Sequence, residues 1–280
     1  MKRYIQTGLF ILAAGIAITA CNSGDDKKNT KDSTAKKEVA KGPQPGDTMK
    51  LDPTKRYIYL TWDDGPQPPG TKNCMNIFRE QGVKATFFAV GFNSYDRSRD
   101  RIIDSIKNSY PQFLLANHSY SHCFNDKYQT FYKMVDSAAS DFVKNEQKFN
   151  IPVKIIRLPG NNAWIGDDIN KGPNSTRGVR EKLGSMGYSV IGWDVEWGFV
   201  RGSVPKQSAT QLVAEINKKF DDEYTEEPNT MVILAHDRMF GKQQYADSLT
   251  RFITLLKQDP RNVFETLDHY PMVMRTKSKK

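Results

Sequence analysis

The sequence predicts an α/β fold in which a parallel sheet is built from repeated strand–helix units. Short apolar runs alternate with longer segments whose apolar residues recur every three or four positions. Several chemically reactive side chains directly follow an apolar run, as they do at the carboxyl ends of strands in β/α barrels. Residues 51–280 are numerous enough for one sizeable domain with one core. We therefore expect a single parallel β/α domain with its reactive residues at one edge of the sheet.

The strands and helices follow in order from these two patterns. Apolar runs predict strands over residues 56–62, 85–90, 112–116, 153–158, 188–195, 230–235 and 263–266. Apolar stripes at helical spacing predict helices around residues 74–82, 102–106, 134–143, 179–186, 212–220 and 249–256. Gly82 is a stop signal for the first helix. Ser208 and Gln211 form a capping box before the fifth helix.

The N-terminus is predicted to be a targeting segment. Lys2 and Arg3 precede an apolar stretch, residues 8–20, that is short for a membrane span. It ends in Ile-Thr-Ala-Cys, which resembles a bacterial lipobox with Cys21 as the lipidated residue. We therefore expect a lipoprotein signal peptide over 1–20 and a lipid-anchored tether over 21–50. In that case the protein is extracytoplasmic, on the periplasmic face of a bacterial membrane or at the cell surface. The alternative is ordinary signal cleavage near an unmodified Cys21.

The net charge of +9 comes mostly from the ends of the chain. The predicted tether has seven lysines against five acidic residues, and residues 275–280 carry four positive charges and no negative ones. The tether also lacks the large apolar side chains that a packed core needs. Because no basic stripe with interleaved aromatic residues occurs, the sequence gives little support to nucleic-acid binding.

Two short motifs carry the clearest chemical signal. Asp63 and Asp64 follow an apolar run within Thr-Trp-Asp-Asp-Gly-Pro, residues 61–66, and His118 and His122 lie four residues apart. One carboxylate and two imidazoles can form a metal site with three protein ligands and an open position. The second carboxylate can then accept a proton from water that the ion activates. Since two of the four histidines form this pair, chance is a poor explanation.

Further motifs make the chain similar to a known family. The two stretches above resemble the first and second motifs of the polysaccharide deacetylase family, carbohydrate esterase family 4, which has the NodB homology domain. Arg157 begins an Arg-Leu-Pro run like the family's third motif, and His236 ends a Leu-Ala-His run like the fifth. The resemblance covers about residues 55–271, with the motifs in the family's order. It implies a distorted, incomplete (β/α) barrel of about seven repeats.

The resemblance also implies a metal site and a base. Asp64, His118 and His122 would bind a divalent ion, with Zn²⁺ as the first expectation and Co²⁺ or Ni²⁺ as alternatives. Asp63 would act as the base that accepts a proton from water. Arg157 would orient Asp63 through a charge-assisted hydrogen bond.

His236 is implied as the acid that protonates the leaving group, and two acidic residues could support it. The family's fourth motif usually reads Asp-x-x-Asp-Trp, whereas residues 192–197 read Gly-Trp-Asp-Val-Glu-Trp. Either Asp194 or Glu196 could hold His236 in its working tautomer, and the position of the preceding tryptophan favours Glu196. The third motif continues Gly-Asn-Asn, where the family has an aromatic residue and glycine, so the wall of the acetyl pocket stays open to question.

These residues predict a metal-dependent deacetylase acting on a polysaccharide, with N-acetyl groups of a hexosamine-containing glycan as the first expectation. An O-acetyl xylan esterase is an alternative. A catalytically degenerate lipoprotein that binds glycan without turnover is another, because the third and fourth motifs are altered. The expected partners are an acetylated polysaccharide and, through lipid on Cys21, a membrane.

Other residues keep two interpretations. Cys74 and Cys123 could form a disulfide or stay packed and unpaired, and an extra ligand role for Cys123 is conceivable. Trp164, Trp197 and Phe199 could stack on sugar rings or pack in the core. The segments 161–177 and 198–229 look like loop insertions on the catalytic side.

Overall fold

A computed structural model describes residues 48–278. The predicted signal peptide, 1–20, and most of the predicted tether, 21–50, therefore lie outside the described residues. Within residues 48–278, no helix combines the length and the apolar character that crossing a bilayer requires.

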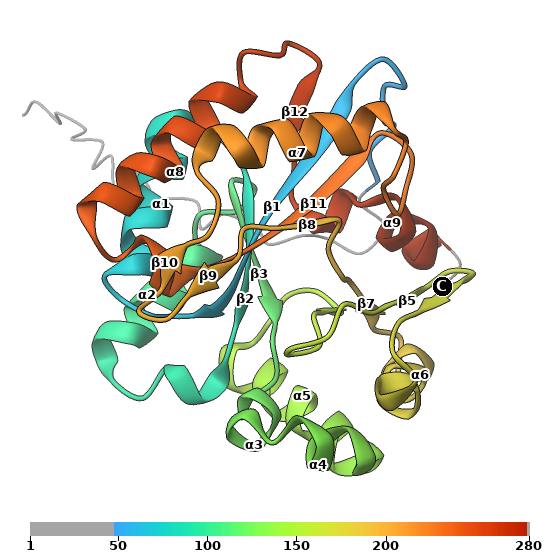
Figure 1. Cartoon of the computed structure of the whole chain (residues 1–280). Coiled ribbons are helices and arrows are strands. Elements are labelled where there is room, and N and C mark those ends of the chain that lie inside the picture. The colour runs from blue at the N-terminus through green and yellow to red at the C-terminus, as the bar shows by residue number, and fades with distance from the viewer. Residues whose placement is uncertain (1–47, 279–280) are drawn as a thin grey trace, which may run out of the picture. The chain divides into compact units, whose positions relative to one another are not determined.

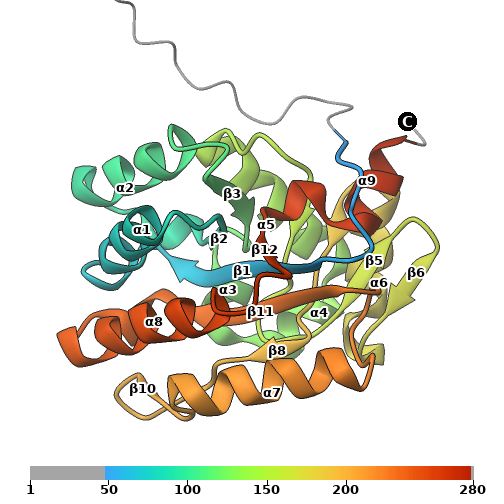
Figure 2. The ribbon, with the colours of Figure 1, turned by 90° about the horizontal axis from the view of Figure 1, so that it is seen from above.

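A curved, mostly parallel sheet forms the centre of the described region (Figures 1 and 2). Its main strands are β1 (Arg56–Gly65), β2 (Ala85–Ala89), β3 (Phe113–Asn117), β4 (Ile155–Ile156), β7 (Ser189–Val190), β8 (Val195–Glu196), β11 (Thr230–His236) and β12 (Asn262–Phe264). The order is β7-β4-β3-β2-β1-β11-β8, all parallel, and β12 pairs with the start of β1. The sheet is the predicted parallel β/α arrangement, curled into a half-barrel.

Helices surround the curved sheet (Figure 2). They are α1 (Gly70–Gln81), α2 (Arg97–Lys107), α3 (His122–Asp126), α4 (Tyr128–Lys133), α5 (Val135–Phe149), α6 (Arg177–Ser185), α7 (Ala209–Asp221), α8 (Gln243–Leu256) and α9 (Pro271–Ser278). Gly82 ends α1 in the left-handed conformation, with φ 66°, and Ser208 and Gln211 form the predicted capping box of α7.

Aromatic packing holds α1 against the sheet. Trp62 of β1 meets the Phe78 ring of α1 edge-on at 5.0 Å between ring centroids. Phe87 of β2 and Phe113 of β3 meet at 5.4 Å, also edge to face, and Phe78 contacts both of them. Edge-to-face pairs of this kind add about 0.5–1.5 kcal/mol each beyond the burial of their surface. This packing holds β1, β2 and β3 against α1.

The structure differs from the prediction in the second half of the chain. The strand expected over 188–195 is two short strands, β7 and β8, separated by residues 191–194. Residues 161–177, expected as a loop insertion, contain the hairpin β5 (Trp164–Gly166) and β6 (Ile169–Lys171), which joins the sheet antiparallel to β7. Residues 198–229 contain a second hairpin, β9 (Phe199–Val200) with β10 (Val204–Pro205), and the whole of α7.

Candidate metal centre and active site

Side chains at the end of β1 alternate between the hydrophobic core and the candidate site. Alternation along a strand puts Thr61 and Asp63 on one face and Trp62 on the other. Trp62 packs into the core, whereas Nη1 of Arg157 donates to Oγ1 of Thr61 at 2.6 Å and to Oδ1 of Asp63 at 2.9 Å. Asp63 is therefore held on the inner face of the half-barrel, and its side chain is 4% exposed.

Asp64 breaks the alternation of β1. Its φ of 72° is left-handed, and the pairing of β1 with β2 shifts register between Asp63 and Gly65. Regular alternation along a strand would direct these adjacent side chains to opposite sides, and the bulge prevents this. Because of the bulge, Oδ2 of Asp63 and Oδ1 of Asp64 both approach Nε2 of His118, at 3.5 and 3.6 Å.

Asp64, His118 and His122 form one group whose ligand atoms all lie within 4.8 Å of one another. His118 follows β3, and its Nδ1 faces the carbonyl oxygen of Arg157 at 3.0 Å. His122 begins α3, and its Nδ1 faces Oδ1 of Asp126 at 2.6 Å. If each Nδ1 carries the proton that it donates, each Nε2 presents a lone pair to the centre of the group.

This donor set fits a divalent metal. Nε2 of His122 lies 3.2 Å from Oδ1 of Asp64. That oxygen is buried, and it has no hydrogen-bond partner among residues 48–278. One carboxylate and two imidazoles leave a tetrahedral ion with an open fourth position, the arrangement of catalytic sites. The oxygen and nitrogen donors suit zinc and do not exclude other transition metals.

The protonation states of these residues favour the binding of a cation. Burial lowers the pKa of His118 to about 3, so its imidazole is neutral. Burial alone would raise the pKa of Asp64, but the adjacent His122 imidazole and the nearby imidazoles of His236 and His118 lower it far below its usual range. Burial raises the pKa of Asp63, even though Arg157 opposes this effect. Asp64 is thus the stronger anion, and Asp63 has the higher affinity for a proton.

Arg157 follows β4 and is completely buried. Besides binding Asp63, its Nε donates to the carbonyl oxygen of Ile191 at 3.2 Å and its Nη2 to that of Gly192 at 2.7 Å. The guanidinium therefore joins the end of β1 to the segment between β7 and β8. The structure places Arg157 next to Asp63, as its predicted role requires.

His236 ends β11 and is the register partner of Asp63 on β1. The Phe199 ring of β9 meets its imidazole edge-on at 5.0 Å, so the hairpin β9–β10 borders the site. Burial lowers the pKa of His236, and its buried Nδ1 has no hydrogen-bond partner among residues 48–278.

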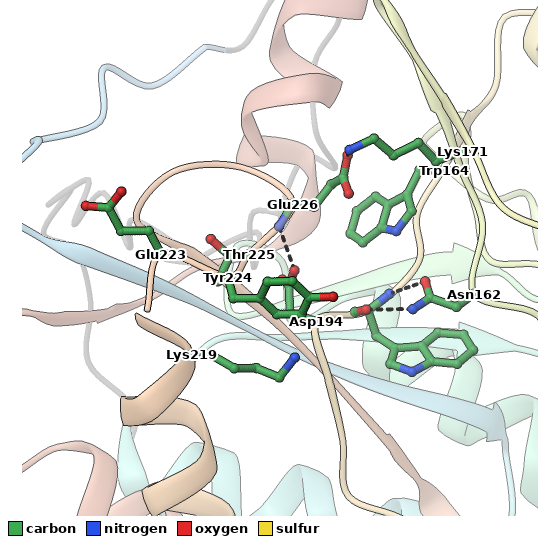
Figure 3. Close-up of a pocket in the computed structure, with 10 residues that line it drawn as sticks. Asn162, Trp164, Lys171, Asp194, Lys219, Glu223, Tyr224, Thr225 and Glu226 are labelled. Carbon is green, nitrogen blue, oxygen red and sulfur yellow. Dashed lines mark hydrogen bonds and ion pairs between the residues drawn. The ribbon is translucent and has the colours of Figure 1, made fainter. Parts of the chain in front are cut away.

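Neither predicted supporting acid contacts His236. Both oxygens of Asp194 accept backbone N–H groups, from Glu226 at 2.8 Å and from Val232 at 2.7 Å. Figure 3 shows Asp194 directed toward Glu226 in a cavity of about 450 Å³ at the gap between β7 and β8. Glu196 is exposed on β8. The carboxylate of Asp194 in the altered fourth motif therefore binds backbone and has a structural role. The prediction that Asp194 or Glu196 supports His236 was wrong, because the break between β7 and β8 directs both side chains elsewhere.

Two residues at the site were not foreseen. Nη2 of Arg238 lies 2.5 Å from Oδ2 of Asp64, and its guanidinium also lies over the Phe199 ring at 5.0 Å. Asp126 contacts His122 as described above. The one available signal was spacing, since Asp126 follows His122 by four residues and Arg238 follows His236 by two.

The remaining candidates divide between core and site. Trp197 is fully buried against Phe240 and Phe252, and Trp164 stacks on Tyr270 while its edge lines the cavity of Figure 3. Of the three predicted stacking rings, Phe199 lies beside the site.

The two cysteines of the described region are not bridged. Cys74 and Cys123 are both free and buried, and Cys123 is not part of the Asp64, His118 and His122 group. The disulfide considered above therefore does not form, and the packed, unpaired interpretation holds.

Comparison with known proteins agrees with this geometry. A family model described as polysaccharide deacetylase matches residues 50–169. A chitin disaccharide deacetylase of Vibrio alginolyticus is 25% identical, with 78% of this chain and 72% of the relative aligned. A chitooligosaccharide deacetylase of Rhizobium leguminosarum bv. trifolii is 37% identical over 43% of this chain and 53% of its own length.

Solved structures show the same fold. A carbohydrate esterase family 4 enzyme of Streptococcus mutans superposes with a TM-score of 0.58 at 21% identity, covering 76% of this chain and 86% of that one. A polysaccharide deacetylase of Bacillus cereus gives a TM-score of 0.54 at 22% identity, covering 78% and 96%. Residues 50–169 are thus similar to the polysaccharide deacetylase family, and the chain has the half-barrel fold of these solved enzymes.

Proposed function

We propose that the protein is a metal-dependent carbohydrate deacetylase that hydrolyses N-acetyl groups of a hexosamine-containing glycan. One observation carries the proposal. A three-residue metal site, an Arg-paired carboxylate and a partly buried histidine, His236, meet at the carboxyl edge of one parallel sheet. The relatives named as chitin disaccharide and chitooligosaccharide deacetylases support an N-acetylated substrate.

The roles follow from the contacts. Asp64, His118 and His122 would hold the ion, preferably zinc, which supplies Lewis acidity toward water and toward the acetyl carbonyl. Asp63 is the proton acceptor. Arg157 holds its Oδ1, so Oδ2, which faces the metal group, is the oxygen that takes the proton from the attacking water. His236, in register with Asp63, would then deliver a proton to the leaving nitrogen, because an amine leaves poorly as an anion.

Acetate release tests the proposal. The purified full chain is loaded with zinc and incubated with N-acetyl chitooligosaccharides and, separately, with O-acetyl xylan. We expect acetate from the N-acetyl substrate, loss of release with EDTA, and recovery with added zinc. His118→Ala should lose metal and activity together, and His236→Ala should keep the metal and slow turnover.

Each other outcome selects an alternative. Release from xylan alone would identify an O-acetyl esterase. Glycan binding without acetate release by the zinc-loaded chain would identify a degenerate, glycan-binding protein. A chain that carries no metal and does not respond to EDTA would contradict the enzyme assignment.

We further propose that the domain is tethered outside the cytoplasm through lipid on Cys21. The proposal rests on the lipobox-like sequence, because Cys21 lies outside the described residues. Such an anchor would place the site near cell-surface or external glycan without a membrane-spanning helix.

A further inference from the structure

The segment that carries His122 has an unusual backbone. His122, Cys123, Phe124, Asn125 and Asp126 all have positive φ, between 48° and 65°. The N–H of Asn125 donates to the carbonyl of Ser121 and that of Lys127 to the carbonyl of Cys123, both at 2.8 Å. The element α3 is therefore a left-handed helical turn. Each residue in it costs free energy, because its Cβ crowds the next carbonyl oxygen.

Buried contacts hold this turn in place. The hydroxyl of Ser121 accepts the N–H of Phe124 at 2.8 Å, and the Phe124 ring packs on Phe131 of α4 at 4.9 Å. Cys123 is fully buried. A strained backbone that the surroundings fix so firmly is a feature of functional sites, so its effect on the neighbouring side chains has to be considered.

The effect of the turn is to bring Asp126 onto His122. Oδ1 of Asp126 lies 2.6 Å from Nδ1 of His122, and the hydroxyl of Tyr128 donates to the same oxygen at 2.8 Å. The Tyr128 ring also meets the His122 ring edge-on at 6.0 Å. One short segment thus fixes the Asp126 carboxylate, the Tyr128 hydroxyl and the His122 imidazole relative to one another.

This contact has a direct consequence for the metal group. With the proton on Nδ1, Nε2 of His122 carries the lone pair that faces Asp64. His118 receives the same support from the carbonyl of Arg157, which is neutral, whereas His122 receives it from a carboxylate. A carboxylate raises the basicity of the imidazole and fixes its orientation, and loss of such a partner weakens metal affinity.

The geometry points to Asp126 as the positioning residue of His122, placed there by the left-handed turn of α3. This inference rests on the metal site of the proposed function. An exposed ion pair would be the competing interpretation, since the Asp126 side chain is 63% exposed. That interpretation gives Asp126 no influence on zinc affinity, so the two can be separated by measurement.

Zinc dissociation constants of the full chain and its variants, measured by competition with a chromophoric chelator, test the inference. Asp126→Ala and Asp126→Gly should each weaken zinc binding by about 10- to 100-fold. Asp126→Asn, which keeps an acceptor oxygen and loses the charge, should lie in between. Glycine accepts positive φ, so Asp126→Gly preserves the turn and removes only the carboxylate.

Asn125→Ala is the matched control. Asn125 is an exposed neighbour with φ 60°, close to the 65° of Asp126, so alanine strains the backbone equally at both positions. Its zinc affinity should stay within about twofold of the wild type, since Asn125 does not support a ligand. In the metal-free protein, long-range ¹⁵N–¹H NMR should show His122 protonated on Nδ1 and a shift toward Nε2 in Asp126→Gly.

Two results would overturn the inference while leaving the metal site intact. One is wild-type zinc affinity in Asp126→Gly, and the other is an equal loss of affinity in Asn125→Ala. A wild-type chain that binds no zinc would overturn the metal site of the proposed function and this inference with it.

Discussion

Arg157 and Asp63 form a buried ion pair, with 2.9 Å between Nη1 and Oδ1, in which the Arg157 side chain is fully shielded and the Asp63 side chain is 4% exposed. Two buried charges are tolerated when both are paired and their remaining donors are satisfied. Thr61 and the carbonyl groups of Ile191 and Gly192 accept three of the other four N–H groups of the guanidinium. The pair therefore serves both the orientation of the proposed base and the integrity of the half-barrel.

Removing Arg157 should destabilise the fold. Arg157→Met leaves the Asp63 carboxylate buried without its partner, and we expect the free energy of unfolding to fall by about 3–5 kcal/mol. Urea denaturation of metal-free protein measures this change. A double-mutant cycle with Asp63→Asn should show coupling of about 1–3 kcal/mol, because the asparagine needs no counter-charge. Additive losses would mean that Arg157 acts through its carbonyl contacts alone.

Asp63 and Asp64 should separate metal binding from turnover. Asp63→Asn keeps all three proposed ligands, so we expect bound zinc to be retained and acetate release to fall by about 10²–10⁴-fold as the base is lost. Asp64→Asn removes a charged ligand and should weaken zinc binding itself. Metal analysis and rates on both variants test this. Equal metal loss would show that both carboxylates are ligands and that another group is the base.

Glu265 should make the free energy of unfolding depend on pH in the acid range. Its side chain is 5% exposed, and burial would raise its pKa, but His269, Lys84 and the N–H of Thr266 lower the pKa to about 2 from 4.5. A carboxylate with a lowered folded pKa contributes stability above pH 4.5 that is lost as the pH falls toward 2. The full contribution is roughly 3 kcal/mol.

Unfolding of Glu265→Gln measured from pH 7 to pH 3, without metal, tests this prediction. The stability difference from the wild type should be largest at neutral pH and shrink below about pH 4.5. Glu80→Gln, on the exposed face of α1, is the control and should stay close to the wild type throughout. A difference that does not change with pH would contradict the prediction.

Position 65 requires glycine, because the Asp237 side chain packs closely against its backbone. A Cβ there would lie 2.5 Å from Oδ2 of Asp237, a carboxyl that is fully buried and hydrogen-bonded to Thr71. Gly65→Ala should therefore cost about 1–3 kcal/mol through overpacking, measured as a lower thermal midpoint. At Gly241 the nearest atoms would be 3.7 Å away, so Gly241→Ala should be tolerated. Similar midpoints for both variants would show that the site relaxes around the added methyl group.

Cys21→Ser should move the protein from the membrane fraction to the soluble fraction. Lipid on Cys21 is the anchor that the sequence suggests, and no apolar run in the described residues could replace it. Immunoblots of fractions separated by ultracentrifugation measure the change, with Cys74→Ser as the control. Unchanged partition of Cys21→Ser would mean that the lipobox was misinterpreted.

The strands and the principal reactive residues could be predicted because their signals are local. Apolar runs predict β1, β3 and β11, and parallel pairing then gathers the side chains that follow them at one edge. The support of His236 could not be predicted in the same way. Asp194 binds the backbone of residues 32 and 38 positions away, and no local pattern encodes that contact.

The geometry of the metal site could not be predicted from the sequence either. The left-handed conformation of Asp64 and of the whole of α3 depends on tertiary packing, since neither aspartate nor histidine demands positive φ. For this reason the spacing of His118 and His122 indicated a metal site but not its supporting residues.

The position of Asp194 has a consequence for self-association. A barrel that fails to close keeps a strand edge with free N–H groups, onto which a strand of another molecule can add. Here β8 pairs with β11 at Ile233 and Leu234, and just before that point Asp194 occupies the N–H of Val232 with its carboxylate. The Asp194 carboxylate thus accepts the hydrogen bond that a carbonyl group of an added strand would otherwise accept. Because the N–H of Asp194 also donates to the carbonyl of Val232, both backbone groups of Val232 are taken, and we expect no strand of another molecule to add at this position.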